Sequence, residues 1–291
     1  MPKATVNGIE IAYEVQGTGT PVLFIHGGWG GPATSLVPAD LAVARALGDD
    51  VTLISFDRRS AGLSQYVLDE FTVKDIAADA RALLAHLGID RSVVIGHSMG
   101  GMVALQYAFD YPHHVIGLCL AGTGANLMPD IDLGRAGSAL VARCKSEGDR
   151  AVFDSLKDTL RAAPVVSPAE PRPAEAMRRL EQRNEVVAKA LKDVSEADLY
   201  RYWLGSVRNY NAFIGHDFTA RLREIKMPAL VIHGSGDTIV PEQYGKALHS
   251  GIAGSEFCEL DGGGHGVFDY PRAHDALRAW VSKVGRSAVP A

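Results

Sequence analysis

The sequence predicts an α/β protein: a mostly parallel central sheet flanked by helices, with an inserted all-helical segment. Short, continuously apolar runs bounded by Gly, Pro or Asp recur along the chain, as expected for strands buried on both faces of a parallel sheet. Helical patterns lie between these runs, and such alternation implies right-handed crossovers in an open sheet. The alternation stops between about residues 125 and 215, where only helical patterns occur. We therefore expect a first core part at residues 1–124, a helical cap at 125–215 and a second core part at 216–291.

The strands can be placed in chain order. Residues 9–15 alternate apolar and polar side chains, which predicts a half-exposed antiparallel strand. Residues 256–260 predict a last strand of the edge type. The continuously apolar runs, which predict the buried strands, are residues 22–25, 51–56, 93–95, 115–120 and 230–232.

The helices follow from apolar stripes and from stop signals. Residues 75–87 carry one apolar stripe that ends at Gly88, and the helix at 102–109 is stopped by the pair Tyr111-Pro112. A proline-rich connector separates the second and third helices of the cap. The four helical patterns of the cap cover residues 133–145, 151–160, 174–192 and 196–210.

Composition and charge limit the partners and the compartment. The 291 residues are 47% apolar and 22% charged, as in a soluble globular protein, and the net charge of −5 excludes a basic footprint for nucleic acid. No run of 18 apolar residues and no apolar block near the N-terminus occurs, so neither a membrane span nor a signal peptide is expected. Three widely spaced cysteines and no paired metal-ligand spacing indicate a cytoplasmic protein without a metal or other cofactor. The expected partner is a small-molecule substrate, and the oligomeric state stays open.

A serine motif lies between a predicted strand and a predicted helix. In Gly96-His97-Ser98-Met99-Gly100, the serine must sit on a tight turn that strains its backbone and projects its hydroxyl above the sheet edge. Small residues two positions before and after it keep the crowded backbone segments apart. The N-terminus of the following helix points at the hydroxyl. The motif predicts Ser98 as a nucleophile; the plain alternative is a glycine-rich turn whose serine has no chemical role.

A serine nucleophile needs a base and a carboxylate, and both follow later strands. Residues 230–232 run into a glycine-rich loop that ends in Asp237, and His265 lies in a second such loop after residues 256–260. The chain order Ser98, Asp237, His265 and the shared carboxyl edge of the sheet predict a catalytic triad. Taken singly, Asp237 could cap a helix and His265 could be an ordinary loop histidine.

A third glycine-rich loop, at residues 26–31, directly follows the first buried strand. Stabilising a tetrahedral oxyanion needs backbone N–H donors that can approach it closely. We expect the N–H groups of Gly28 and Met99 to be these donors, with Trp29 as the next candidate. His26 is expected to hold the loop through hydrogen bonds from its ring.

Together these residues resemble the α/β-hydrolase fold superfamily, and the resemblance covers nearly the whole chain outside the cap. It implies a helical cap and a serine hydrolase in which Ser98 attacks an acyl carbon, His265 takes its proton and Asp237 orients the imidazole. A serine nucleophile disfavours the dehalogenases and epoxide hydrolases of this fold. The matching motifs are HGGWGG at 26–31, DRRSAGLS at 57–64, GHSMGG at 96–101, HGSGD at 233–237 and GGGH at 262–265.

The motif at residues 57–64 resembles the family's D-x-R-G-x-G-x-S loop. The resemblance implies that Asp57 and Arg58 brace the site rather than react. Ser60 and Leu63 depart from the glycine and the basic residue that are usual in the family.

Substrate choice is expected to depend on the cap. Aromatic residues gather at helical spacings near residue 203, and with Trp29 they predict a hydrophobic lid over the acyl or alcohol group. Packing of the cap helices on each other explains the same pattern equally well. Cap charges are nearly balanced, which indicates no charged substrate. The predicted substrate-binding residues are Trp29, Tyr202, Trp203 and Tyr210.

The favoured function is a serine hydrolase that cleaves a small-molecule carboxylic ester or lactone through an acyl-enzyme. One alternative is an aminopeptidase similar to prolyl iminopeptidases, although Trp29 replaces the proline of their HGGPG loop and the cap has no Trp-Glu pair of the kind that grips a substrate amine. A second is a cofactor-free perhydrolase, C–C hydrolase or oxygenase. A third is a ligand-binding module that resembles a hormone receptor, in which the cap signals closure.

Overall fold

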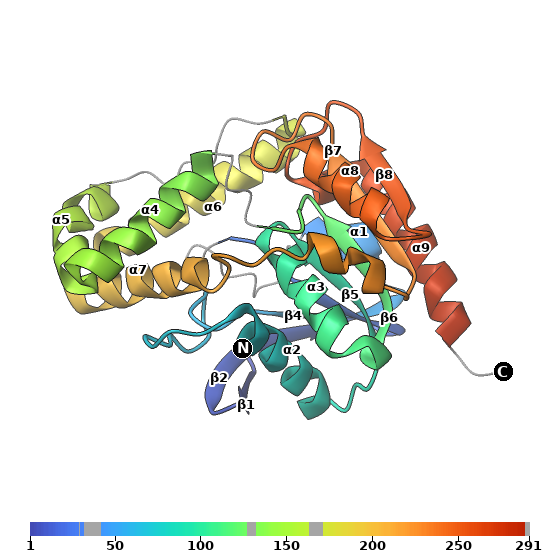
Figure 1. Cartoon of the computed structure of the whole chain (residues 1–291), viewed down its shortest axis with the longest axis horizontal. Helices are drawn as coiled ribbons and strands as arrows, with labels where there is room; N and C mark the ends of the chain where they lie inside the picture. Colours follow the sequence, from blue (N-terminus) through green and yellow to red (C-terminus); the bar gives the residue numbers. More distant parts are fainter. Residues whose placement is uncertain (29, 32–41, 127–131, 163–170, 289–291) are drawn as a thin grey trace.

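The computed structural model describes residues 1–28, 30–31, 42–126, 132–162 and 171–288 (Figure 1). One sheet of eight strands runs through this part of the chain, and helices lie on both of its faces. No helix within these ranges is both long enough and apolar enough to cross a membrane.

The sheet has the strand order β1-β2-β4-β3-β5-β6-β7-β8. The β1–β2 and β2–β4 pairs are antiparallel and all other pairs are parallel, so the prediction of a mostly parallel sheet is confirmed. A strand that the sequence analysis did not anticipate, β1, pairs with the outer side of β2. The strands are β1 (Lys3–Val6), β2 (Ile9–Gln16), β3 (Thr20–Ile25), β4 (Val51–Phe56), β5 (Ser92–His97), β6 (Val115–Ala121), β7 (Ala229–Gly234) and β8 (Glu256–Leu260).

Helices α2, α3 and α8 pack on one face of the sheet, and α1 and α9 pack on the other. Alternate residues of one strand serve the two cores: Ile54 and Phe56 belong to the core under α2 and α3, while Leu53 belongs to the core under α1 and α9. Burial on both faces is why the strands are continuously apolar. These helices are α1 (Ala42–Leu47), α2 (Val73–His86), α3 (Met99–Asp110), α8 (Glu242–Gly251) and α9 (Pro271–Ala288), with short 3-10 helices at Pro112–His114, Thr219–Glu224 and Val267–Asp269.

The start of α2 shows how local sequence sets an element. The Thr72 hydroxyl accepts a hydrogen bond from the Asp75 N–H at 3.4 Å, and the Asp75 carboxylate accepts one from the Thr72 N–H at 2.7 Å. This reciprocal capping satisfies N–H groups that have no partner within the helix. The helix therefore begins at Val73, two residues before the predicted start.

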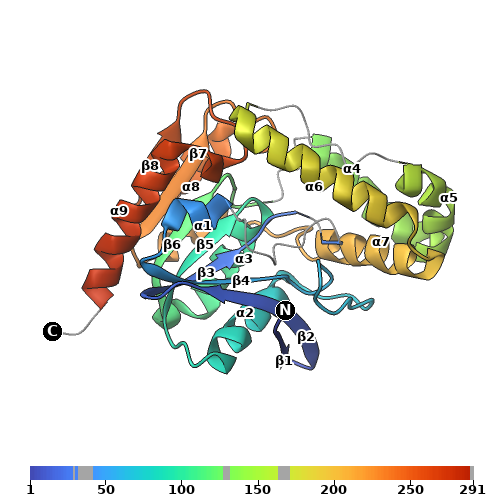
Figure 2. The same ribbon diagram turned by 180° about the vertical axis from the view of Figure 1, so that it is seen from behind.

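Four α-helices of the described residues follow β6 in the chain and precede β7. They gather beside the sheet, on the side away from α9, in both views (Figures 1 and 2). The Phe153 ring lies 5.1 Å from that of Tyr200 and 5.6 Å from that of Trp203, so aromatic side chains bind these helices to each other. We call them the helical group; its role as a separate cap domain with bounds 125–215 stays a prediction. Its members are α4 (Asp132–Glu147), α5 (Asp149–Ala162), α6 (Ala174–Lys192) and α7 (Glu196–Asn211).

Candidate active site

Ser98 lies at the turn between β5, which ends at His97, and α3, which begins at Met99. Its backbone angles are φ +54° and ψ −129°, a conformation that costs free energy for a residue with a Cβ. The Ser98 N–H donates to the Ala121 carbonyl at 2.9 Å, and the Ser98 carbonyl accepts from the Thr123 hydroxyl at 2.6 Å. Hydrogen bonds on both sides of the residue thus hold the strained turn in place.

The glycines around Ser98 are required by space. A Cβ on Gly96 would lie 2.6 Å from the Gly101 Cα, and one on Gly100 would lie 2.1 Å from the Ile25 carbonyl oxygen. Neither contact can be relieved by a side-chain rotation, because both partners are backbone atoms. The end of β3, where the glycine-rich loop at residues 26–31 begins, is therefore packed directly against the first turn of α3.

The structure brings Asp237 and His265 into direct contact. Asp237 follows β7 and His265 follows β8, and the His265 Nδ1–H donates to Asp237 Oδ2 at 2.8 Å. Both residues are buried, with 6% and 7% of their surface exposed. The other carboxylate oxygen accepts from the N–H groups of Ile239 and Val240 at 2.9 and 2.8 Å. This arrangement places the proton on Nδ1 and leaves the Nε2 atom of His265 as a base.

The pKa of Asp237 is held below its usual range. Burial acts to raise it, but the hydrogen bond from His265 and the one from the Val240 N–H stabilise the charged form more strongly. A second histidine, His233, lies with its Nε2 atom 3.6 Å from the same carboxylate oxygen and donates to the Val240 carbonyl at 2.8 Å. Asp237 is thus an ionised carboxylate between two imidazoles.

His97, which sequence reasoning did not assign, packs against His265. The two ring centroids lie 5.0 Å apart, and the His97 Nε2–H donates to the His265 carbonyl at 2.9 Å. The pKa of His97 is lowered to about 3, mainly by burial and secondly by the neighbouring His265. His97 is therefore neutral at physiological pH and links the residue before Ser98 to the loop of His265. Its place inside the serine motif is the one signal that could have pointed to it.

The side chains of His26 and Arg58 hold the glycine-rich loop at residues 26–31 in place. We call it the predicted oxyanion loop; its described residues are 26–28, 30 and 31. His26 Nε2 accepts from the Arg58 N–H at 3.3 Å, so its proton is on Nδ1, which donates to the Gly27 carbonyl at 2.6 Å. The Arg58 guanidinium, fully buried, donates from Nη2 to the Gly28 carbonyl at 2.6 Å. Gly28 has φ +77°, which favours glycine.

The two predicted oxyanion donors lie at the carboxyl edge of neighbouring strands, Gly28 after β3 and Met99 after β5. As the first residue of α3, Met99 has an N–H with no acceptor inside the helix. A Cβ on Gly27 would lie 3.2 Å from the Ser98 hydroxyl oxygen, so the loop passes directly beside the predicted nucleophile. Trp29, the third candidate, lies outside the described residues.

Ser60, at the position of the family's usual glycine, adopts a left-handed conformation with φ +57°. Its hydroxyl exchanges hydrogen bonds with Val67, donating to the carbonyl at 3.0 Å and accepting from the N–H at 2.9 Å. The Asp57 carboxylate accepts from the Leu63 N–H at 2.8 Å. The departures from the family motif therefore leave a closed, hydrogen-bonded loop.

The three predicted aromatic substrate residues on α7 pack against different parts of the protein. Trp203 is 7% exposed and packs on Phe153, and the Tyr210 hydroxyl donates to the Gly134 carbonyl at 2.6 Å, so both have partners within the helical group. Tyr202 instead packs on Tyr66 of the core, with ring centroids 5.0 Å apart. These contacts bind the helical group to itself and to the core; substrate contact by the three side chains stays a prediction.

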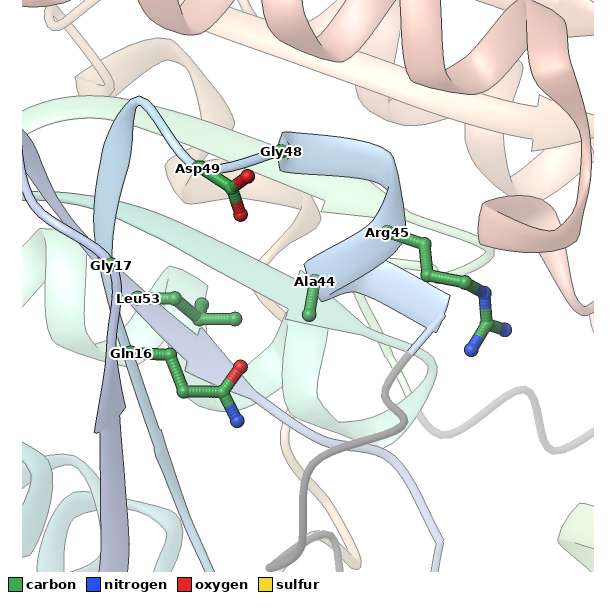
Figure 3. Close-up of a pocket in the computed structure, with 7 residues that line it drawn as sticks. All are labelled: Gln16, Gly17, Ala44, Arg45, Gly48, Asp49 and Leu53. Atoms are coloured by element: carbon green, nitrogen blue, oxygen red, sulfur yellow. The ribbon is translucent and has the colours of Figure 1, made fainter.

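A shallow pocket of about 250 Å³ lies away from these residues (Figure 3). Its lining comes from the end of β2, from α1 and from the start of β4, which is the amino end of that parallel strand and thus the edge opposite Ser98. Asp49 and Arg45 are its charged residues, and Arg45 lies 4.0 Å from Asp269. Within the described ranges, no group of three or more His, Cys, Asp or Glu residues is placed to hold a metal.

Comparisons with known proteins identify the family to which the chain belongs. A family model described as alpha/beta hydrolase fold matches residues 20–271. A protein of Cronobacter sakazakii assigned as the carbamate hydrolase RutD is 29% identical over 249 residues, 85% of this chain and 84% of that protein. The bifunctional esterase/perhydrolase DCH of Acinetobacter calcoaceticus is 27% identical over 278 residues, 90% of this chain and 92% of that protein. A solved thermophilic esterase from Thermogutta terrifontis has a TM-score of 0.71 at 26% identity and covers 98% of each chain.

Proposed function

Because the chain belongs to the alpha/beta hydrolase fold family, we propose that it is a serine hydrolase of small-molecule carboxylic esters or lactones. The observation that carries the proposal is the buried hydrogen bond from His265 Nδ1 to Asp237 Oδ2, on the sheet edge where Ser98 occupies its strained turn. The relatives named as hydrolases and as an esterase support an enzyme of this kind. Ser98, Asp237 and His265 are its proposed catalytic triad.

The proposed reaction proceeds in two steps. Ser98 Oγ forms a bond to the acyl carbon while His265 Nε2 takes the hydroxyl proton, and the N–H groups of Gly28 and Met99 stabilise the oxyanion. The bond to the leaving alcohol breaks as His265 returns the proton to its oxygen. Water, deprotonated by His265, then cleaves the acyl-enzyme and restores the Ser98 hydroxyl. Asp237 stabilises the imidazolium that forms in each step.

The helical group is the proposed cap of this site. It approaches the core through Tyr202, whose ring meets Tyr66, and through Arg208, which donates to the Leu68 carbonyl at 2.8 Å. A cap tied to the core in this way can enclose the acyl or alcohol group and exclude water. We propose that Trp29 and Tyr202 contact the substrate directly, while Trp203 and Tyr210 keep the cap helices in place.

A second candidate, perhydrolysis, is favoured by one relative, which is named as both an esterase and a perhydrolase. In that reaction hydrogen peroxide replaces water as the attacking group, so that the acyl-enzyme yields a peracid and a free serine. Peracid formed from an ester in the presence of hydrogen peroxide, measured beside carboxylic acid release, separates the two outcomes.

Labelling with a fluorophosphonate probe tests the proposed function. We expect the probe to modify Ser98 stoichiometrically, because a serine activated by His265 attacks phosphorus as it attacks an acyl carbon. Peptide mass spectrometry identifies the labelled residue, and turnover of p-nitrophenyl acetate by the unlabelled enzyme is measured in parallel. A protein that is neither labelled at Ser98 nor active on the ester is not a serine esterase.

Acidification is expected to lower kcat/KM, because a protonated His265 imidazole cannot accept the serine proton. Asp237 stays ionised above about pH 4, since its pKa lies below the usual value for a carboxyl group. The pH profile of ester hydrolysis measures this dependence. A rate that stays flat down to about pH 4, near the ordinary titration of a carboxyl group, contradicts the role given to His265.

A further inference from the structure

Asn209, in helix α7 of the helical group, is a fully buried polar side chain that faces the core. Its Nδ2 atom donates to the carbonyls of Arg59 at 3.0 Å, Ser60 at 3.3 Å and Gly205 at 3.1 Å. Its Oδ1 atom is buried without a hydrogen-bond partner among the described residues. One amide thus joins α7 to the backbone of the loop at residues 57–64.

That loop is in turn paired with the oxyanion loop. The Ser60 carbonyl, already bonded to Asn209, also accepts from the Gly31 N–H at 3.0 Å, and the Gly62 N–H donates to the Gly31 carbonyl at 3.0 Å. Asn209 also lies directly against the oxyanion loop, because a Cβ on Gly30 would be 2.6 Å from its Nδ2 atom. The amide of Asn209 therefore sits where α7, the loop at 57–64 and the oxyanion loop meet.

The surroundings of Asn209 contain two unfavourable features. Its buried amide oxygen has no partner among the described residues, and the left-handed Ser60 backbone next to it is strained. An apolar side chain would avoid the unpaired oxygen. The amide, however, holds the Ser60 carbonyl in place, and that carbonyl in turn accepts the hydrogen bond from the Gly31 N–H. An apolar side chain on α7 could not make this connection to the Ser60 carbonyl.

We propose that Asn209 is a positioning residue that couples the seating of α7 to the geometry of the oxyanion loop. The inference rests on the proposed function, since it assumes that the Gly28 N–H stabilises an oxyanion. Oxyanion donors act only within about 2.7–3.1 Å of the developing charge, so a small shift of the loop at residues 27–31 reduces catalysis without preventing substrate binding. The helical group is on this view part of the catalytic support as well as a lid.

The test compares two substitutions on the same helix. Asn209→Leu keeps the branched shape and the number of heavy atoms and removes the amide. Asn211→Leu is the matched control, because the Asn211 amide donates to Glu70 at the surface at 3.3 Å. We expect Asn209→Leu to lower kcat about 10- to 100-fold per titrated serine, with KM changed less than threefold, as for partial loss of an oxyanion donor. The control should stay within about twofold of the unmodified enzyme for both parameters. Asn209→Asp, nearly the same shape but without donors, is the second variant should the leucine variant fail to fold.

Amide hydrogen exchange supplies a readout that does not depend on activity. Residues 22–31 should exchange about tenfold faster in Asn209→Leu or Asn209→Asp than in the unmodified protein, while residues 99–110 of α3 keep their protection. Unchanged exchange at 22–31, or an unchanged kcat in a variant with a lowered Tm, overturns the proposal and leaves Asn209 as a packing residue. Failure of the proposed function looks different: the unmodified protein is then inert to the fluorophosphonate, while the exchange comparison still decides the role of Asn209.

Discussion

Replacing Ser98 with alanine is expected to lower kcat about 10⁴-fold or more, because no other group can form the acyl-enzyme once the hydroxyl is removed. His265→Ala should have an effect of the same size, since the hydroxyl then has no base. The double variant should lose little beyond either single one, because the two residues act as a unit. Hydrolysis of p-nitrophenyl acetate under substrate saturation measures all three rates.

A second serine, at the beginning of β5, provides the control. Ser92 begins β5, at the end opposite Ser98, and its buried hydroxyl has no hydrogen-bond partner among the described residues. Ser92→Ala should therefore leave kcat within about twofold of the unmodified enzyme. Full activity in Ser98→Ala would mean that a different nucleophile, or direct attack by water, carries the reaction.

Asp237→Asn is expected to lower kcat on the order of 10³- to 10⁴-fold. The amide oxygen would remain with the N–H groups of Ile239 and Val240, which already bond Oδ1, so the NH₂ group would face His265. An NH₂ group at that place can donate only to an unprotonated Nδ1, which moves the imidazole proton to Nε2. His265 would then present a proton where the reaction needs a base.

The neighbouring loop offers a control for Asp237 as well. Asp261 is an exposed carboxylate four residues before His265, and Asp261→Asn changes the same charge without reaching the imidazole. It should retain nearly full kcat, whereas Asp237→Asn should not. Equal activities of the two variants would place the acid of the triad elsewhere.

The sheet could be predicted from the sequence because burial on both faces gives a strand an unbroken apolar pattern. The bounds predicted for 51–56 and 256–260 agree with β4 and β8. The predicted ends of helices were less accurate where tertiary contacts determine them. Helix α3 starts at Met99, three residues before the predicted start, because it begins directly at the strained Ser98. No prediction was made for α1, α8 and α9, whose positions depend on contacts with the sheet face that a local pattern does not contain.

The candidate site was predictable where chemistry demands a residue type at a strand end. Ser98, Asp237 and His265 each follow a strand whose neighbours in the sheet are fixed by the parallel order. Asn209 was not predictable, because it and Asn211 are the same residue type on one helix and differ only in burial. The aromatic pattern near Trp203 likewise predicts which residues share one face of a helix, but it does not predict what that face packs against. For Trp203 the partner is Phe153.

The glycines that crowd the nucleophile also decide which parts of the protein can diversify. A Cβ on Gly96 or Gly100 would collide with backbone atoms, and one on Gly27 would collide with Ser98. None of the three can therefore accept even a methyl group without displacing the turn that holds Ser98. We therefore expect substitutions in the helical group, apart from Asn209, to disturb the proposed site less than substitutions at these glycines. A library aimed at altered selectivity should therefore sample α4 to α7, keep Asn209 of α7, and leave the strand ends alone.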